Sequence, residues 1–173
     1  MGRIVCLLVA MLAAMGCTLH HRPADFAIDP GSIPPLPGAE AVTVTRGQVS
    51  AAARSRLSVP SYTVTVDYLE YTDAAVDRLR AELLRSGIAV SGHARNTLRL
   101  AVAYVTIVRS AGSFSCVIDF SVETGDGYRK GHQARAHSWD FRKACNAAIS
   151  NIVVVTLNDP KVRAYLSGSI TKP

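Results

Sequence analysis

The sequence predicts an α+β fold, with an antiparallel-leaning or mixed sheet and two main helices packed on one face. Apolar and polar residues alternate over residues 62–69, 98–108 and 114–123, which is typical of strands. Apolar residues recur at helical spacing over residues 73–86 and 141–156. Runs of strands separated by single helices, without a regular strand-helix repeat, favour the α+β class.

The first half of the expected domain starts with a strand at residues 41–45. Residues 49–57 are ambiguous, because several alanines allow a short helix as well as a strand. We expect Thr72 or Asp73 to cap a helix that runs to Ser86.

The second half begins with a short strand at residues 88–90. Residues 98–108 are apolar on both faces and therefore predict a central strand. One face of that strand is expected to carry Leu98, Leu100, Val102, Tyr104 and Val108. Residues 124–127 (Thr-Gly-Asp-Gly) signal a hairpin, and the more polar residues 128–137 predict a return strand near an edge.

A second helix follows the hairpin, with Ser138 as its expected N-cap. Trp139 is interpreted as a packing anchor at the start of this helix. The helix should end at residues 158–160 (Asn-Asp-Pro), followed by a short helical segment at 161–166.

The N-terminus predicts export from the cytoplasm. Arg3 precedes an uncharged apolar run at residues 4–14, and Gly16 stands directly before Cys17. This is the layout of a secretory signal peptide. An ordinary signal peptide and an uncleaved anchor stay open as alternatives, although a run of about a dozen residues falls short of the roughly 20 that span a bilayer.

The Gly-Cys ending resembles the bacterial lipobox. That resemblance implies cleavage before Cys17 and acylation of this cysteine by palmitate-type chains. The residue after the cysteine is Thr18 rather than Asp, and by the sorting rules of that family this implies transfer to the outer membrane. The expected organisation is a lipoprotein signal peptide at 1–16, a lipidated Cys17 with a Pro/Gly-rich tether at 17–40, and a single α+β domain at 41–173.

Five of the eight prolines lie within residues 18–40, which favours a semi-rigid extended spacer. The alternative is that Phe26 and Ile28 dock onto the domain. In the mature chain, Cys116 and Cys145 form an even pair in an oxidising compartment, which favours a disulfide over two buried thiols. The formal net charge of +6 is compatible with anionic lipid, glycan phosphate or an acidic partner, and equally with a solvated basic surface.

Few residue patterns suggest chemistry. His132 and His137 are five apart on an expected strand and therefore point to opposite faces, so no metal site is predicted. Cys145 with His137 is the one tempting nucleophile-base pair, and the expected disulfide argues against it. No enzyme activity, cofactor or nucleic-acid partner is expected. Arg99, Arg129 and Arg135 are candidate ligands for anionic groups.

The Gly16-Cys17 signal, the Pro-rich segment, the helix before Gly87, the hairpin at 125–127 and the helix ending at 158–160 together resemble the YajG-like bacterial envelope lipoproteins. The order of elements is also similar to that of assembly-factor lipoproteins such as the plug of the lipopolysaccharide translocon.

The resemblance implies a lipid-anchored protein of the outer membrane that faces the periplasm. The expected function is non-enzymatic binding as an accessory or assembly factor of an envelope complex. A lipid- or anionic-ligand-binding module is the alternative, and an envelope enzyme is the third. The expected partners are the membrane and an envelope protein, and the oligomeric state stays open.

Overall fold

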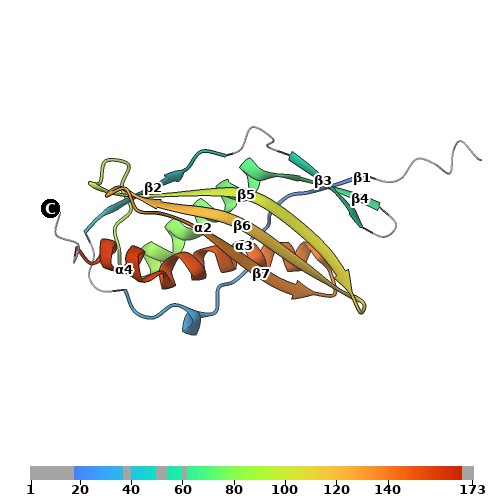
Figure 1. Cartoon of the computed structure of the whole chain (residues 1–173). Helices are drawn as coiled ribbons and strands as arrows, with labels where there is room; N and C mark the ends of the chain where they lie inside the picture. The colour runs from blue at the N-terminus through green and yellow to red at the C-terminus, as the bar shows by residue number, and fades with distance from the viewer. Residues whose placement is uncertain (1–17, 37–39, 50–53, 60–61, 169–173) are drawn as a thin grey trace, which may run out of the picture.

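The computed structural model describes residues 18–36, 40–49, 54–59 and 62–168, which form two mixed sheets and three α-helices (Figure 1). The strands are β1 (Thr18–His21), β2 (Val42–Arg46), β3 (Arg54–Val59), β4 (Tyr62–Asp67), β5 (Asn96–Ser110), β6 (Ser113–Thr124) and β7 (Arg129–Ser138). The helices are α2 (Tyr68–Arg85), α3 (Phe141–Asn158) and α4 (Pro160–Leu166), with a 3₁₀ turn, η1, at Pro30–Ser32.

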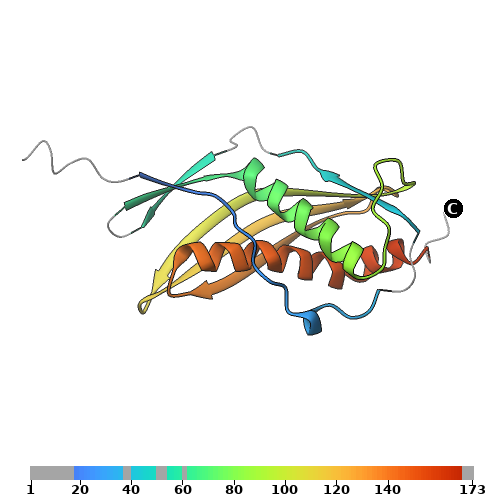
Figure 2. The same cartoon turned by 180° about the vertical axis from the view of Figure 1, so that it is seen from behind.

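The larger sheet has the strand order β2-β5-β6-β7, in which β2 runs parallel to β5 and the other neighbours are antiparallel. Helices α2 and α3 cover one face of this sheet, as Figure 2 shows from the helical side. The predicted α+β class with two helices on one face is therefore confirmed. The smaller sheet, in the order β1-β4-β3, was not expected as a separate unit.

Strand β6 shows why the helices pack on one particular face of the larger sheet. Its even-numbered residues from Cys116 to Val122 are fully or almost fully buried, while the odd-numbered residues between them are polar or only partly buried. Burying the apolar row against the helices removes it from water, which is the main favourable term in folding. We call this helix-covered side the inner face and the opposite side the outer face.

A bulge in β5 changes the face of the sheet on which Tyr104 and Val108 lie. The pairing with β6 shifts between Val102 and Tyr104, so the alternation of side chains reverses at this point. Val105 and Ile107 are consequently buried on the inner face. Tyr104 and Val108, which were expected to share a face with Val102, are instead about half exposed.

Helix α2 begins earlier than expected, because Asp67 and not Thr72 or Asp73 is its N-cap. The Asp67 carboxylate accepts the backbone N–H groups of Leu69 and Glu70 at 2.9 and 3.4 Å. Thr72 lies inside the helix, where its hydroxyl donates to the Tyr68 carbonyl and accepts the Val102 N–H. It thereby ties α2 to β5.

Helix α3 is capped by Asp140, whose carboxylate accepts the Arg142 N–H at 2.8 Å, and Ser138 is instead the last residue of β7. The interpretation of Trp139 as a packing anchor is wrong, because its side chain is 79% exposed. Phe141 takes the packing role two residues later and is 5% exposed.

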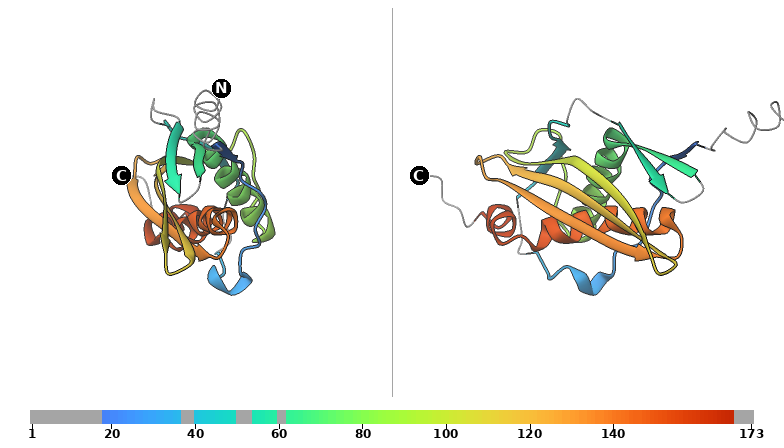
Figure 3. Two further views of the ribbon diagram at one scale, coloured as in Figure 1. Left: turned by 90° about the vertical axis from the view of Figure 1, so that its right-hand side faces the viewer. Right: turned by 45° about the vertical axis from the view of Figure 1, so that its right-hand side comes forward.

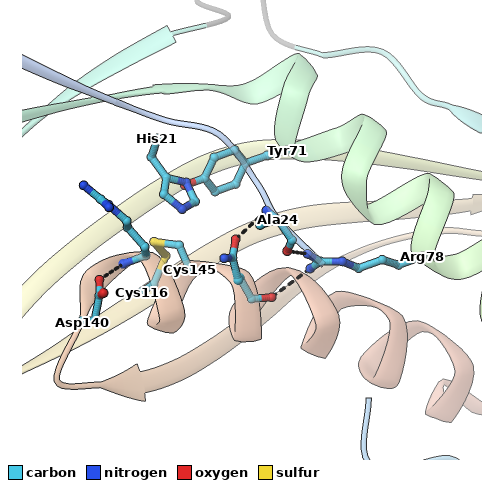
Figure 4. Close-up of a disulfide and its surroundings, with 9 residues drawn as sticks. His21, Ala24, Tyr71, Arg78, Cys116, Asp140 and Cys145 are labelled. Atoms are coloured by element: carbon cyan, nitrogen blue, oxygen red, sulfur yellow. Dashed lines mark hydrogen bonds between the residues drawn. A yellow bond between two sulfur atoms is a disulfide. The ribbon is translucent and has the colours of Figure 1, made fainter. Parts of the chain in front are cut away.

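The disulfide predicted between Cys116 and Cys145 is present. It joins the inner face of β6 to the buried side of α3, with both residues completely buried (Figure 4). The covalent link therefore fixes the helix layer to the sheet.

Two further segments differ from expectation. Residues 54–59 of the ambiguous stretch form strand β3, which pairs with β4, while residues 50–53 lie outside the described residues. Residues 88–90 provide only an isolated bridge, between Val90 and Val42, and no strand of their own.

Residues 18–36 do not form the expected spacer. Strand β1 pairs in parallel with β4, and the chain then crosses α3 and α2 before it reaches α4 (Figure 2). Side chains of these helices donate to its backbone carbonyls: Arg78 to Ala24, Ser150 to Phe26, Asn158 to Ser32, and Arg163 to Pro34 and Pro35.

The docking alternative therefore describes this segment, which we call the strap. Ile28 is partly buried against the core, whereas Phe26 stays 43% exposed. After β1, the proline-containing part of the strap lacks some N–H donors and joins no sheet, but its carbonyls still need donors, and the helices supply them. The docked part of the described chain therefore includes residues ahead of Ala41, from Thr18 to Leu36.

Candidate functional site

The outer face of the larger sheet is the candidate site, because no helix of the described residues covers it. Its side chains come from the odd-numbered positions of β6 and β7 and from their β5 neighbours. This row is rich in small and polar residues, which is unusual for a face that would be buried in a core. The composition suits a surface that meets water or a partner.

One wall of the site is the chain that follows β2. The Gly47 N–H donates to the Leu100 carbonyl at 2.7 Å, and a Cβ on Gly47 would lie 3.2 Å from the Ala101 Cβ. Glycine therefore permits the chain to lie directly on the sheet. Gln48 and Val49 follow and stand over the outer face as a rim.

The rim and the sheet enclose two adjoining hollows, of about 760 and 470 Å³. Both contact Gln48, Ser121 and Arg129, so they form one continuous depression, which we call the outer groove. The larger hollow is floored by Ala101, Ala103 and Gly131, whose small side chains leave the space open.

The smaller hollow is basic. Arg46, Arg99 and Arg129 line it, and Glu123 is the one carboxylate among its lining residues. Arg99 already pairs with Glu123 at 3.0 Å, and Arg46 pairs with Asp73 at 3.2 Å. Among the described residues, no carboxylate lies within ion-pair distance of Arg129. An anionic group in the groove would therefore find Arg129 available.

The structure brings together two of the three arginines proposed from the sequence. Arg99 and Arg129 both lie opposite Glu123 in the β5-β6-β7 ladder. Arg135 is on the same face but six residues further along β7, about 20 Å away at strand spacing. It does not line the outer groove.

Sequence reasoning missed Arg46, Gln48 and Ser121. The alternation that placed Ser121 on the polar side of its strand was visible, and it could have identified this residue. Arg46 and Gln48 reach the site only because β2 pairs in parallel with β5. No local sequence pattern predicts this pairing.

Not every histidine faces solvent. His21 is 3% exposed, and its Nδ1 is hydrogen-bonded to the Tyr71 hydroxyl at 2.6 Å. Burial, assisted by the nearby charge of Arg142, lowers the pKa of His21 to about 4. His132 and His137 lie on opposite faces of β7, as predicted.

Asp159 forms the most connected polar cluster. One carboxylate oxygen lies 3.0 Å from the Tyr128 hydroxyl and 3.3 Å from both Lys130 Nζ and His132 Nε2. The other accepts the Lys161 and Val162 N–H groups and so caps α4. Burial alone would raise the pKa of Asp159, but these donors together lower it. The cluster holds β7 against α4.

The tempting pair of Cys145 and His137 is not brought together. Cys145 is in the disulfide beneath the sheet, whereas His137 points from the outer face. Within the described residues, no group of three metal-ligating side chains occurs. None of the described helices is long and apolar enough to span a bilayer.

The chain matches no protein-family model and no curated protein. The likeness to the YajG-like lipoproteins therefore stays a prediction. Cys17 and the signal peptide at 1–16 lie outside the described residues, so lipidation also stays a prediction.

Proposed function

We propose that this protein is a lipid-anchored lipoprotein of the bacterial outer membrane that faces the periplasm. In this proposal it acts without catalysis, as a binding and assembly factor for an envelope complex. Cys17 would carry the acyl chains, and the outer groove would bind an acidic segment of an envelope protein. The observation that carries the proposal is the uncovered outer face with its basic groove.

The groove supports a protein partner because of its shape. Two adjoining hollows extend over β5, β6 and β7, which suits an extended chain better than a compact molecule. Arginine is enriched where proteins contact one another. Among the described residues, no carboxylate is paired with the Arg129 guanidinium, so it is available to a partner. Edge strand β7 has exposed Lys130 and Arg135, which oppose uncontrolled strand pairing.

A second candidate follows from the smaller hollow alone. Three arginines around one cavity suit the phosphate of a lipid or glycan, because guanidinium groups bind oxyanions in bidentate geometry. In this case the protein would be an envelope module that binds an anionic ligand.

Photo-crosslinking in living cells tests the proposal. A crosslinker at Ser121 should give one stoichiometric protein adduct, and one at Leu84, exposed on α2, should not. Arg99→Gln with Arg129→Gln should reduce the Ser121 adduct at least tenfold, because two charge-assisted contacts are lost. Equal adducts at both positions would argue against the groove, and lipid or glycan adducts alone would favour the second candidate.

The anchor has its own test. Cys17→Ser should abolish acyl labelling and release the protein from the membrane fraction. Continued labelling of this variant would contradict the lipoprotein assignment. Loss of the Ser121 adduct in this variant would show that the partner also depends on the membrane.

A further inference from the structure

The turn between β5 and β6 and the junction between β7 and α3 form one end of the molecule, with unusual surface chemistry. Trp139, the only tryptophan of the chain, lies at this junction and is 79% exposed. Its ring lies over Gly112 of the turn, 3.3 Å from where a Cβ would be. Burial in the core therefore does not explain a tryptophan at this position.

Two arginines lie over aromatic rings of the same turn and junction. The Arg109 guanidinium lies over the Phe114 ring at 5.6 Å, and that of Arg142 over the Phe141 ring at 5.7 Å. Phe114 and Phe141 are in edge-to-face contact at 6.2 Å, so both guanidinium groups lie on one pair of contacting aromatic rings. Arg109 and Arg142 are themselves exposed. We call Arg109, Gly112, Phe114, Trp139 and Arg142 the tip surface.

The charge of the tip surface is positive. Lys143 adds an exposed cation next to Arg142, while Asp140 is the adjacent carboxylate and is occupied as the α3 N-cap. Tryptophan with arginine or lysine is the combination found where proteins meet the headgroup layer of a membrane. Basic residues there are attracted by anionic lipids.

The N-terminal strand lies at the same end. Figures 1 and 3 place β1 beside this end of the sheet, with α4 at the opposite end. The His21 ring is 5.8 Å from the Phe141 ring, which ties β1 to the tip surface. Thr18 precedes His21 by three residues, or about 10 Å of extended strand.

The strap removes the distance that a spacer would have provided. Because residues 18–36 are docked, an acyl chain on Cys17 would enter the bilayer within about 13 Å of His21 along the strand. The domain would then stand at the membrane surface with this end towards it.

We infer that the tip surface is a membrane-contact site for anionic phospholipid headgroups, with Trp139 inserted in the interface. The inference rests on the proposed lipidation of Cys17. Contact at the tip surface orients the domain with its outer groove away from the bilayer, because β6 runs from the tip surface to that groove. Asp119 and Glu123 are six and ten residues from Ser113, so along β6 the groove lies about 20 to 34 Å from the tip surface.

The test uses an unlipidated mature chain that starts at Cys17→Ser and contains every residue the structure describes. Its probe is vesicles of phosphatidylglycerol with phosphatidylethanolamine, compared with phosphatidylcholine vesicles. The single tryptophan makes its own fluorescence the reporter. Anionic vesicles should shift the emission to the blue, and brominated lipid should quench it, while phosphatidylcholine should do neither.

Matched charge variants separate the tip surface from general basicity. Arg109→Gln with Arg142→Gln should weaken vesicle binding about 30-fold, at roughly fivefold for each surface cation. Arg95→Gln with Lys161→Gln removes the same charge at exposed positions near α4, at the opposite end, and should change binding less than threefold. Equal weakening by both pairs, or unshifted tryptophan emission, would overturn the inference.

A second pair of variants tests the aromatic contribution by vesicle sedimentation. Trp139→Ala should reduce binding roughly tenfold, as expected for apolar surface returned to water, and Tyr104→Ala on the outer face should not. Equal effects of the two would also overturn it. Vesicle binding is measured without the acyl chain, so its failure is distinguishable from failure of Cys17→Ser to release the protein in cells.

Discussion

The two faces of the larger sheet come from the same strands but have opposite properties. The inner face of β6 is covered by α3 and linked to it through the Cys116–Cys145 disulfide. The outer face is open, and its residues from Ser115 to Glu123 pack against no helix of the described residues. The comparison teaches that stability is concentrated on one side of the sheet, which leaves the other side free to vary in shape and charge.

The largest expected difference between the faces is seen by truncating neighbours on β6. Ile118 is completely buried, whereas Val117 is only partly buried on the outer face. Ile118→Ala should cost about 2–5 kcal/mol of unfolding free energy, because it leaves a cavity. Val117→Ala should cost less than about 1 kcal/mol. Urea unfolding of both variants measures this, and equal costs would contradict the comparison.

The next largest effect concerns the disulfide. Replacing both cysteines, as Cys116→Ala with Cys145→Ala, should lower the unfolding free energy by about 3.6 kcal/mol, because a loop of this length is no longer closed in the unfolded chain. Thermal and urea unfolding provide the measurement. The native protein should also show no alkylatable thiol at these positions without reductant. Ready alkylation of both cysteines would contradict the link.

The smallest of the three effects is a dependence of the unfolding free energy on pH. Burial lowers the pKa of His21 from 6.5 to about 4, so the folded state favours the neutral ring while the unfolded chain takes up a proton. Stability is therefore full above pH 6.5 and falls as the pH drops towards 4, by up to about 3 kcal/mol. Burial and Lys130 also lower the pKa of His132, which adds a smaller loss in the same direction.

Unfolding free energy measured between pH 7 and about pH 4 checks this. His21→Phe keeps a ring against Phe141 and should flatten most of the slope. An unaltered slope in His21→Phe would show that other groups carry the pH dependence.

The sequence predicted what depends on local periodicity. The inner row of β6 and the apolar side of α3 were correct, because side-chain burial imposes a period of 2 or 3.6 directly on the residues. Both helix starts were misplaced, since Asp, Ser and Thr all cap helices and several candidates stood close together. Tyr104 was misassigned because a bulge arises from pairing with another strand.

The candidate site was only partly predictable for a related reason. Arg99 and Arg129 were proposed as anion ligands and do line one hollow, but their common neighbour Glu123 and the rim at Gln48 depend on strand register. The strap was only the second alternative, because prolines predict an extended chain without indicating what it lies against. Its donors, such as Arg78 and Asn158, are distant in sequence.

The parallel pairing of β1 with β4 has a mechanical consequence. A tension applied ahead of Thr18 would act along the axis of β1, across the hydrogen bonds that join it to β4. These bonds would be loaded together in shear instead of being unzipped one at a time. A domain pulled between a fixed N-terminus and a cargo on its outer face would therefore resist being peeled open from its first strand.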